Sequence, residues 1–246
     1  MFSDLMLFYR PSWLQGAGVA VPETWQDLIS ASKKVDTWAK QNVGERASGL
    51  VFGIATPMWT AQLWANTTYA KGERLVRNGK VVMDPDAWQV MTDLWLKGGM
   101  SKSSLELSWS SSPEIFAKGN AGFAVDQGVY IRMFDDPNYG TAIQGDWDVT
   151  LGPGWEGKGN RGAEMVQQAW LAINPYTSSE QQAAAMLWID WLRSYQAQFN
   201  QLYVEGNDAF FSAVYDHQAV QAEVPRPDFR QDVVNKLVGE SYPVAM

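Results

Sequence analysis

The sequence contains no cysteine, one histidine and no long apolar run. Without cysteine there is no thiol catalysis, no disulfide and no cysteine-ligated zinc. The single histidine, His217, cannot form a histidine-rich metal site. No stretch approaches the roughly 20 apolar residues of a membrane-spanning helix, and residues 1–11 lack the basic region of a signal peptide. We therefore expect no metal and no other cofactor.

Positive charge is also scarce. The 246 residues include 19 Lys and Arg against 27 Asp and Glu, for a net charge of −8. A chain that binds a phosphate backbone needs clustered Lys and Arg, and this one has no basic tract. We expect no nucleic-acid partner. The length allows one large domain or two smaller ones. A hydrophobic core of this size is stable without a disulfide or a bound metal.

Tryptophan is abundant, with 13 residues in the chain. An indole ring is large and amphipathic, so it serves in a hydrophobic core and also stacks on the flat apolar faces of ligands. The composition alone leaves both uses open, with core packing as the commoner one.

Hydrophobic periodicity and turn residues predict alternating strands and helices. The expected strands are 4–9, 48–55, 121–126, 146–151 and 165–173. The expected helices are 24–41 (capped by Thr24), 57–70, 84–97, 113–118 and 179–194 (capped by Ser179). Glycines at 16 and 18 and Pro22 predict a loop, and Asn78-Gly79 predicts a hairpin turn. The chain is thus expected to be a mixed α/β protein.

Two glycine patterns and the acidic residues are the candidate chemical motifs of the sequence. Residues 152–157 and 157–162 both match G-x-G-x-x-G, but the segment that follows looks extended, whereas a nucleotide site needs a helix there. We expect a surface loop. No Ser-His-Asp arrangement is evident. A hydrolase that uses two carboxylates stays open as an alternative, because any two acidic residues can converge in a fold.

Several segments in order resemble the type 1 extracellular solute-binding proteins of ABC importers, in the sugar-binding group. These segments are LQGAG at 14–18, PETW at 22–25, SWS at 108–110, FAKGNAGF at 116–123 and the Asn174-Pro175 turn before an Ala- and Trp-rich helix. Residues 206–211 resemble the family's G-x-x-P-x-R loop, with Ala209 and Phe211 in place of Pro and Arg.

The resemblance implies an α/β, periplasmic-binding-protein-like fold with two lobes, here as an incomplete copy. Residues 1–160 would form most of the second lobe, 161–200 a returning segment of the first, and 201–246 a helical segment that packs back on the second lobe. The full-length protein would be periplasmic, or extracellular and tethered to a membrane. We expect a monomer. A fragment without function is the other alternative.

The resemblance also implies a function. The protein would bind a sugar or polyol between its lobes, without catalysis, and deliver it to the permease subunits of an ABC importer. We expect Trp59 and Tyr130 to be partly exposed stacking rings and Gln127 to be a hydroxyl partner. The full set of expected ligand-binding residues is Met58, Trp59, Gln127, Tyr130, Gln168, Trp170 and Asn207.

Overall fold

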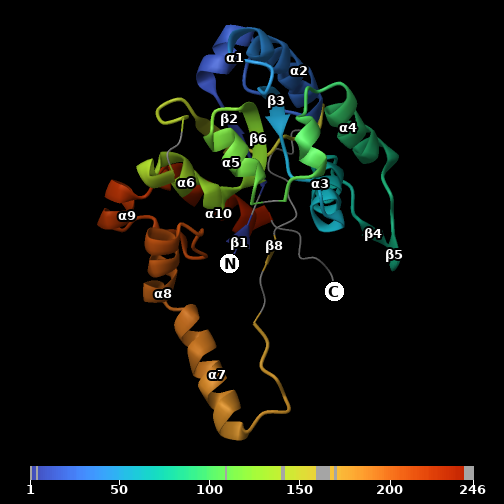
Figure 1. Ribbon diagram of the computed structural model, residues 1–246. Coiled ribbons are helices and arrows are strands. Elements are labelled where there is room, and N and C mark those ends of the chain that lie inside the picture. Colours follow the sequence, from blue (N-terminus) through green and yellow to red (C-terminus); the bar gives the residue numbers. More distant parts are fainter. Residues whose placement is uncertain are drawn as a thin grey trace. The chain divides into compact units, whose positions relative to one another are not determined.

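The computed structural model describes residues 2–3, 5–108, 110–139, 142–158, 167–168 and 171–240 (Figure 1). The chain divides into two compact units. The larger unit holds the described residues between 5 and 158, and the smaller unit holds residues 2–3, 167–168 and 171–240. The assignment of the three sequence segments to lobes stays a prediction.

A four-stranded sheet organises the larger unit. Its order is β3 (Ser48–Val51), β6 (Ala121–Gln127), β2 (Leu5–Tyr9) and β7 (Asp148–Leu151). β3 and β6 run parallel, whereas β2 is antiparallel to both β6 and β7. Successive side chains of a strand point to opposite faces, and both faces of this sheet are covered, so β6 and β2 are buried almost throughout.

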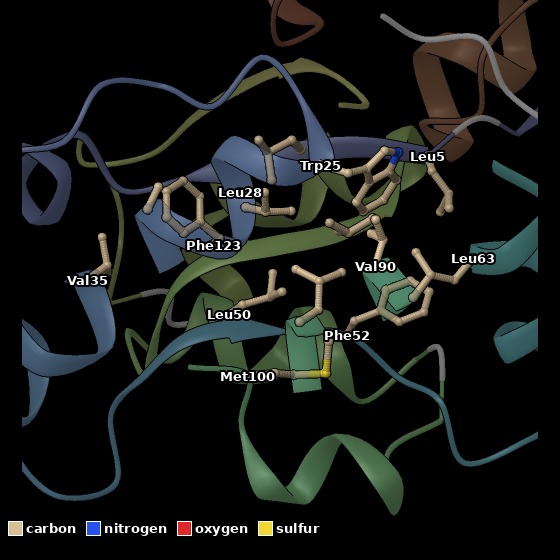
Figure 2. Close-up of a cluster of buried hydrophobic side chains, with 14 of the residues drawn as sticks. Leu5, Trp25, Leu28, Val35, Leu50, Phe52, Leu63, Val90, Met100 and Phe123 are labelled. Atoms are coloured by element: carbon tan, nitrogen blue, oxygen red, sulfur yellow. The ribbon is translucent and has the colours of Figure 1, made fainter. Parts of the chain in front are cut away.

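One face of the sheet packs against α2 (Trp25–Asn42) and α1 (Pro11–Ala17). Leu5, Leu7, Phe123 and Val125 belong to this core together with residues of α2, and Leu63 and Val90 join it from α3 (Pro57–Ala70) and α4 (Pro85–Leu96) (Figure 2). This apolar cluster holds α1, α2, α3 and α4 on the sheet.

The other face carries an aromatic cluster. Phe8 of β2 lies 5.1 Å from Phe134 of α6 (Ile131–Asp135), ring centroid to ring centroid, in an edge-to-face arrangement. Phe116 of α5 (Ser112–Ala117) and Trp147 contact the same Phe134 ring at 5.1 and 5.4 Å. Alternation along β2 therefore sends Leu7 to one core and Phe8 to the other.

Most of the elements expected from the sequence are confirmed. Thr24 and Asp27 form a reciprocal capping box at the start of α2. Asp84 caps α4 by accepting from the backbone N–H groups of residues 86 and 87. Asn78 and Gly79, both with positive φ, turn the chain between β4 (Val76–Arg77) and β5 (Lys80–Val81). Short 3-10 turns occupy Lys102–Leu105 (η1), Gly128–Tyr130 (η2) and Pro137–Tyr139 (η3).

Three expectations need correction. Part of the loop expected around Gly16 and Gly18 is the helix α1, which begins at Pro11 and ends where Gly18 adopts φ 65°. The cap of α7 (Ser179–Leu192) is Ser178, whose Oγ accepts from the N–H of Gln181. Of the strand expected over 165–173, the described residues place only Gln167–Gln168 in a strand, β8, which pairs with β1 (Phe2–Ser3).

The smaller unit is mainly helical. Besides α7 it contains α8 (Tyr195–Asn200), the π-helical η4 (Gln201–Glu205), η5 (Ser212–Val214), α9 (Gln218–Glu223) and α10 (Pro227–Glu240). Its centre is a buried ion pair, in which Arg230 of α10 donates from Nε to Asp208 Oδ1 at 2.7 Å. Across the described part of the chain, no helix is both long enough and apolar enough to cross a membrane.

Candidate functional site

Two of the expected site segments follow adjacent parallel strands. Met58 and Trp59 lie in the first turn of α3, which follows β3, and Gln127 ends β6. Because β3 and β6 run in the same direction, their carboxyl ends meet at one edge of the sheet. Ligands of open α/β sheets bind at this kind of edge. These segments are about 70 residues apart in the sequence, and the parallel pairing of β3 with β6 is what brings them to one edge of the sheet.

The start of α3 differs from the expectation in one respect. Thr56 is the N-cap residue and Pro57 opens the helix, which leaves the Met58 side chain 58% exposed. Trp59, expected to be partly exposed, is only 7% exposed. The reason is that α3 is enclosed around most of its circumference, with nine of its 14 residues buried. A role for Trp59 in ligand binding stays a prediction.

The end of β6 has a defined local geometry. Gln127 is extended and half-buried, and the 3-10 turn η2 then carries the chain through Gly128 to Tyr130. The Tyr130 ring is also half-buried. Burial raises the pKa of its hydroxyl, and the nearby Asp126 and Glu114 raise it further. Tyr130 therefore presents a neutral phenol, which can both stack and hydrogen-bond.

Asp126 comes immediately before Gln127 at the end of β6, and no motif in the sequence points to it. Its side chain is 4% exposed; Oδ2 accepts from Ser112 Oγ at 2.7 Å and Oδ1 accepts from the Gln127 N–H at 2.9 Å. Burial raises the pKa of Asp126 to about 7, against the opposing effect of these two hydrogen bonds. A carboxylate at the end of an otherwise apolar alternating strand is the signal that could have identified it.

Asn207 belongs to the smaller unit. Its N–H donates to Gln201 O at 3.0 Å, and its Nδ2 donates to Glu205 Oε2 at 3.1 Å. The neighbouring Asp208 is fixed by Arg230, which also donates from Nη2 to Gly206 O at 2.6 Å. The loop that carries Asn207 is thus held by a buried charge pair.

The last two expected residues lie at or beyond the limit of the described structure. The backbone of Gln168 is in β8 and pairs with Phe2, but its side chain lies outside the described part, as does the whole of Trp170. Within the described ranges, no three His, Cys, Asp or Glu side chains are grouped so that they could hold a metal ion.

Comparisons with known proteins give a consistent result. A family model of bacterial extracellular solute-binding proteins matches residues 3–199. The maltose-bound MalE3 of T. maritima has a TM-score of 0.80 and 24% identity, over 96% of this chain and 59% of that chain. A solute-binding protein of Agrobacterium radiobacter K84 in complex with ribitol has a TM-score of 0.77 and 21% identity, over 96% and 58%.

A third solved structure extends the comparison. The GacH receptor of Streptomyces glaucescens, solved unliganded and with acarbose, has a TM-score of 0.71 and 21% identity, over 96% of this chain and 57% of that chain. At these identities the likeness establishes the fold, so the expected α/β, periplasmic-binding-protein-like fold is confirmed. The chain spans about 59% of the length of the MalE3 protein that it matches.

Proposed function

Because the chain belongs to the family of bacterial extracellular solute-binding proteins, we propose that it binds a sugar or polyol and delivers it to the permease of an ABC importer. The observation that carries the proposal is the family match over residues 3–199. Solved relatives of the same fold contain maltose, ribitol and D-mannitol, which supports this class of ligand. The family and these relatives are transport proteins and not enzymes, so the two-carboxylate hydrolase is not favoured.

The residues at the carboxyl edge of β3 and β6 suit such a ligand. A sugar offers apolar C–H faces, on which an aromatic ring stacks, and hydroxyl groups, which need donors and acceptors. Tyr130 supplies a half-buried ring with a neutral hydroxyl, and Gln127, three residues earlier in the chain, supplies an amide. Met58 adds an exposed flexible thioether. We propose that these three residues contact the ligand, with Asn207, Gln168 and Trp170 contributing from the remaining segments.

The location follows from the family, whose members are periplasmic or extracellular. Membrane tethering and contact with permease subunits are parts of the proposal. Binding by a protein of two units would favour the arrangement of the units that the ligand contacts best, which is a shift of population and requires no chemical step.

Calorimetric titration tests the proposed ligand class. The chain is titrated with maltose, ribitol and D-mannitol. In a separate assay, it is incubated with a panel of glycosides and their hydrolysis is measured. The proposal expects saturable heat for at least one compound and no hydrolysis. Hydrolysis of a glycoside, or absence of heat from a chain shown to be folded by circular dichroism, would contradict it.

Replacing Tyr130 with alanine should weaken binding of the sugar or polyol by about 1–3 kcal/mol, the scale of one lost aromatic contact. The free energy of unfolding should fall by less than for Phe134→Ala, since truncating a fully buried ring costs about 3–5 kcal/mol. Tyr139, which is 63% exposed on η3, gives the matched control Tyr139→Ala, for which we expect unchanged affinity. Unchanged affinity with a large loss of stability in Tyr130→Ala would assign Tyr130 to the core.

A further inference from the structure

A groove lies between the C-terminal end of α1 and the exposed side of α2. Its volume is about 580 Å³. Its lining residues come from α1 and α2 and include Gly16, Lys33, Lys34 and Trp38. All of them belong to the larger unit, and none is among the residues expected to bind a sugar.

The groove depends on the absence of a side chain at residue 16. A Cβ added to Gly16 would lie only 2.4 Å from Cε2 of Trp38, so only glycine lets the indole ring lie against α1. The Trp38 ring also contacts Trp13 of α1, with ring centroids 5.8 Å apart. The half-buried indole therefore provides a rigid apolar part of the groove.

The charge of the groove is of one sign. Lys33 and Lys34 are its only charged lining residues, and both are exposed. Among the described residues neither makes an ion pair, whereas Lys40 on the same helix pairs with Asp36 at 2.7 Å. In a chain of net charge −8, two unpaired lysines beside an indole ring make a local exception to the acidic surface.

The shape favours an extended occupant. The lining residues of α2 recur at positions 30, 33, 34, 37, 38 and 41, which follow one helix face. At 1.5 Å per residue this face is about 16 Å long, the length of about five extended residues. Most of the lining side chains are exposed, so the groove cannot enclose most of the surface of a small molecule, as ligand pockets do.

We propose that the α1–α2 groove docks an acidic peptide segment of a partner protein. Two carboxylates of the segment would meet Lys33 and Lys34, and an apolar side chain two residues further along the segment, on the same side, would rest on Trp38. The observations that carry this are the cavity, the glycine-dependent position of the indole and the unopposed positive charge. The proposal is independent of which sugar the protein binds, and of whether it binds one.

Fluorescence anisotropy with a defined probe tests the docking site. The probe is a fluorescein-labelled ten-residue peptide of the repeating pattern Glu-Glu-Leu-Leu, which in an extended chain places both Glu and Leu on each face. The control peptide carries Gln in place of every Glu. We expect saturable binding of the Glu peptide, weaker binding of the Gln peptide, and weakening of the former as salt rises. The variant Lys33→Glu/Lys34→Glu should bind the Glu peptide about tenfold more weakly or worse, because two attractive charges become repulsive.

The matched control is Lys80→Glu/Lys102→Glu, which changes the net charge equally at two exposed lysines of the same unit. This control should change the affinity for the Glu peptide by no more than about twofold from that of the wild type, since both lysines lie outside the groove. Equal losses in the two variants, or no binding of the Glu peptide to the folded chain, would overturn the proposal. So would a dimer, found by light scattering, that Lys33→Glu/Lys34→Glu dissociates, because a second copy would then be the occupant.

Discussion

Replacing Arg230 with methionine is expected to lower the free energy of unfolding of the smaller unit by about 3–5 kcal/mol. The Arg230 side chain is fully buried, and its guanidinium group donates to Asp208 Oδ1 at 2.7 Å and to Gly206 O at 2.6 Å. Without the arginine, Asp208 is a buried carboxylate, and its remaining side-chain donor among the described residues is the hydroxyl of Tyr215 at 3.0 Å. A buried charge that loses its partner is far more costly than a surface pair that separates.

Urea denaturation monitored by circular dichroism measures this effect. The control is Lys118→Met, which breaks the exposed pair of Lys118 with Glu114 and should cost no more than about 0.5 kcal/mol. The double variant Asp208→Asn/Arg230→Met should recover part of the loss, because it removes both charges together. Equal costs for Arg230→Met and Lys118→Met would show that the buried pair does not support the fold of this unit.

The same ion pair has a consequence for ligand binding. Arg230 holds the backbone of Gly206 and the side chain of Asp208, on either side of Asn207. We expect Arg230→Met to weaken sugar binding only if Asn207 contacts the ligand. Binding measured well below the urea transition separates this effect from loss of the folded state.

Local signals in the sequence accounted for much of the fold. The helix α3 begins at Pro57 and ends at Ala70, and the β4–β5 hairpin turns at Asn78-Gly79, as the turn and capping residues predict. Such signals act between neighbouring residues. The sequence pattern does not predict the helix α1, because Gly16 and Gly18 favour a loop. Pro11 at its start and Gly18 at its end are nevertheless typical helix-boundary residues.

The candidate site was less accessible to sequence reasoning. An indole at the start of a helix can stack on a ligand or fill a core, and only the packing around α3 shows that Trp59 is buried. The pairing of Arg230 with Asp208 joins residues 22 positions apart in the chain, and no periodicity marks it. The juxtaposition of Ser112 with Asp126 likewise depends on α5 packing against β6. These are tertiary contacts, which propensity and spacing do not specify.

Asp126 makes the stability of the larger unit depend on pH in a defined direction. Its pKa is about 7 in the folded protein, because burial disfavours the charged form, against an ordinary value of 3.8. Between these values the folded state keeps a proton that the unfolded state releases. The free energy of unfolding should therefore fall as pH rises from about 4 to 7, and the slope should vanish above the folded pKa. At 1.36 kcal/mol per pKa unit, the loss is on the order of 4 kcal/mol.

The variant Asp126→Asn isolates this contribution, because the amide resembles the protonated acid in shape and carries no charge. Urea denaturation of both proteins from pH 4 to pH 8 should show similar stabilities at the acid end and a more stable variant at pH 8. Ser112→Ala removes a hydrogen bond that favours the charged form of Asp126, so it should raise the pKa of Asp126 further. The fall in stability should then extend to a higher pH. A stability difference between the wild type and Asp126→Asn that does not change with pH would show that the buried carboxyl of Asp126 does not titrate in this range. The charge of Asp126, next to the turn that carries Gln127 and Tyr130, would then be constant over this pH range. In that case Asp126 would cause no pH dependence of sugar binding.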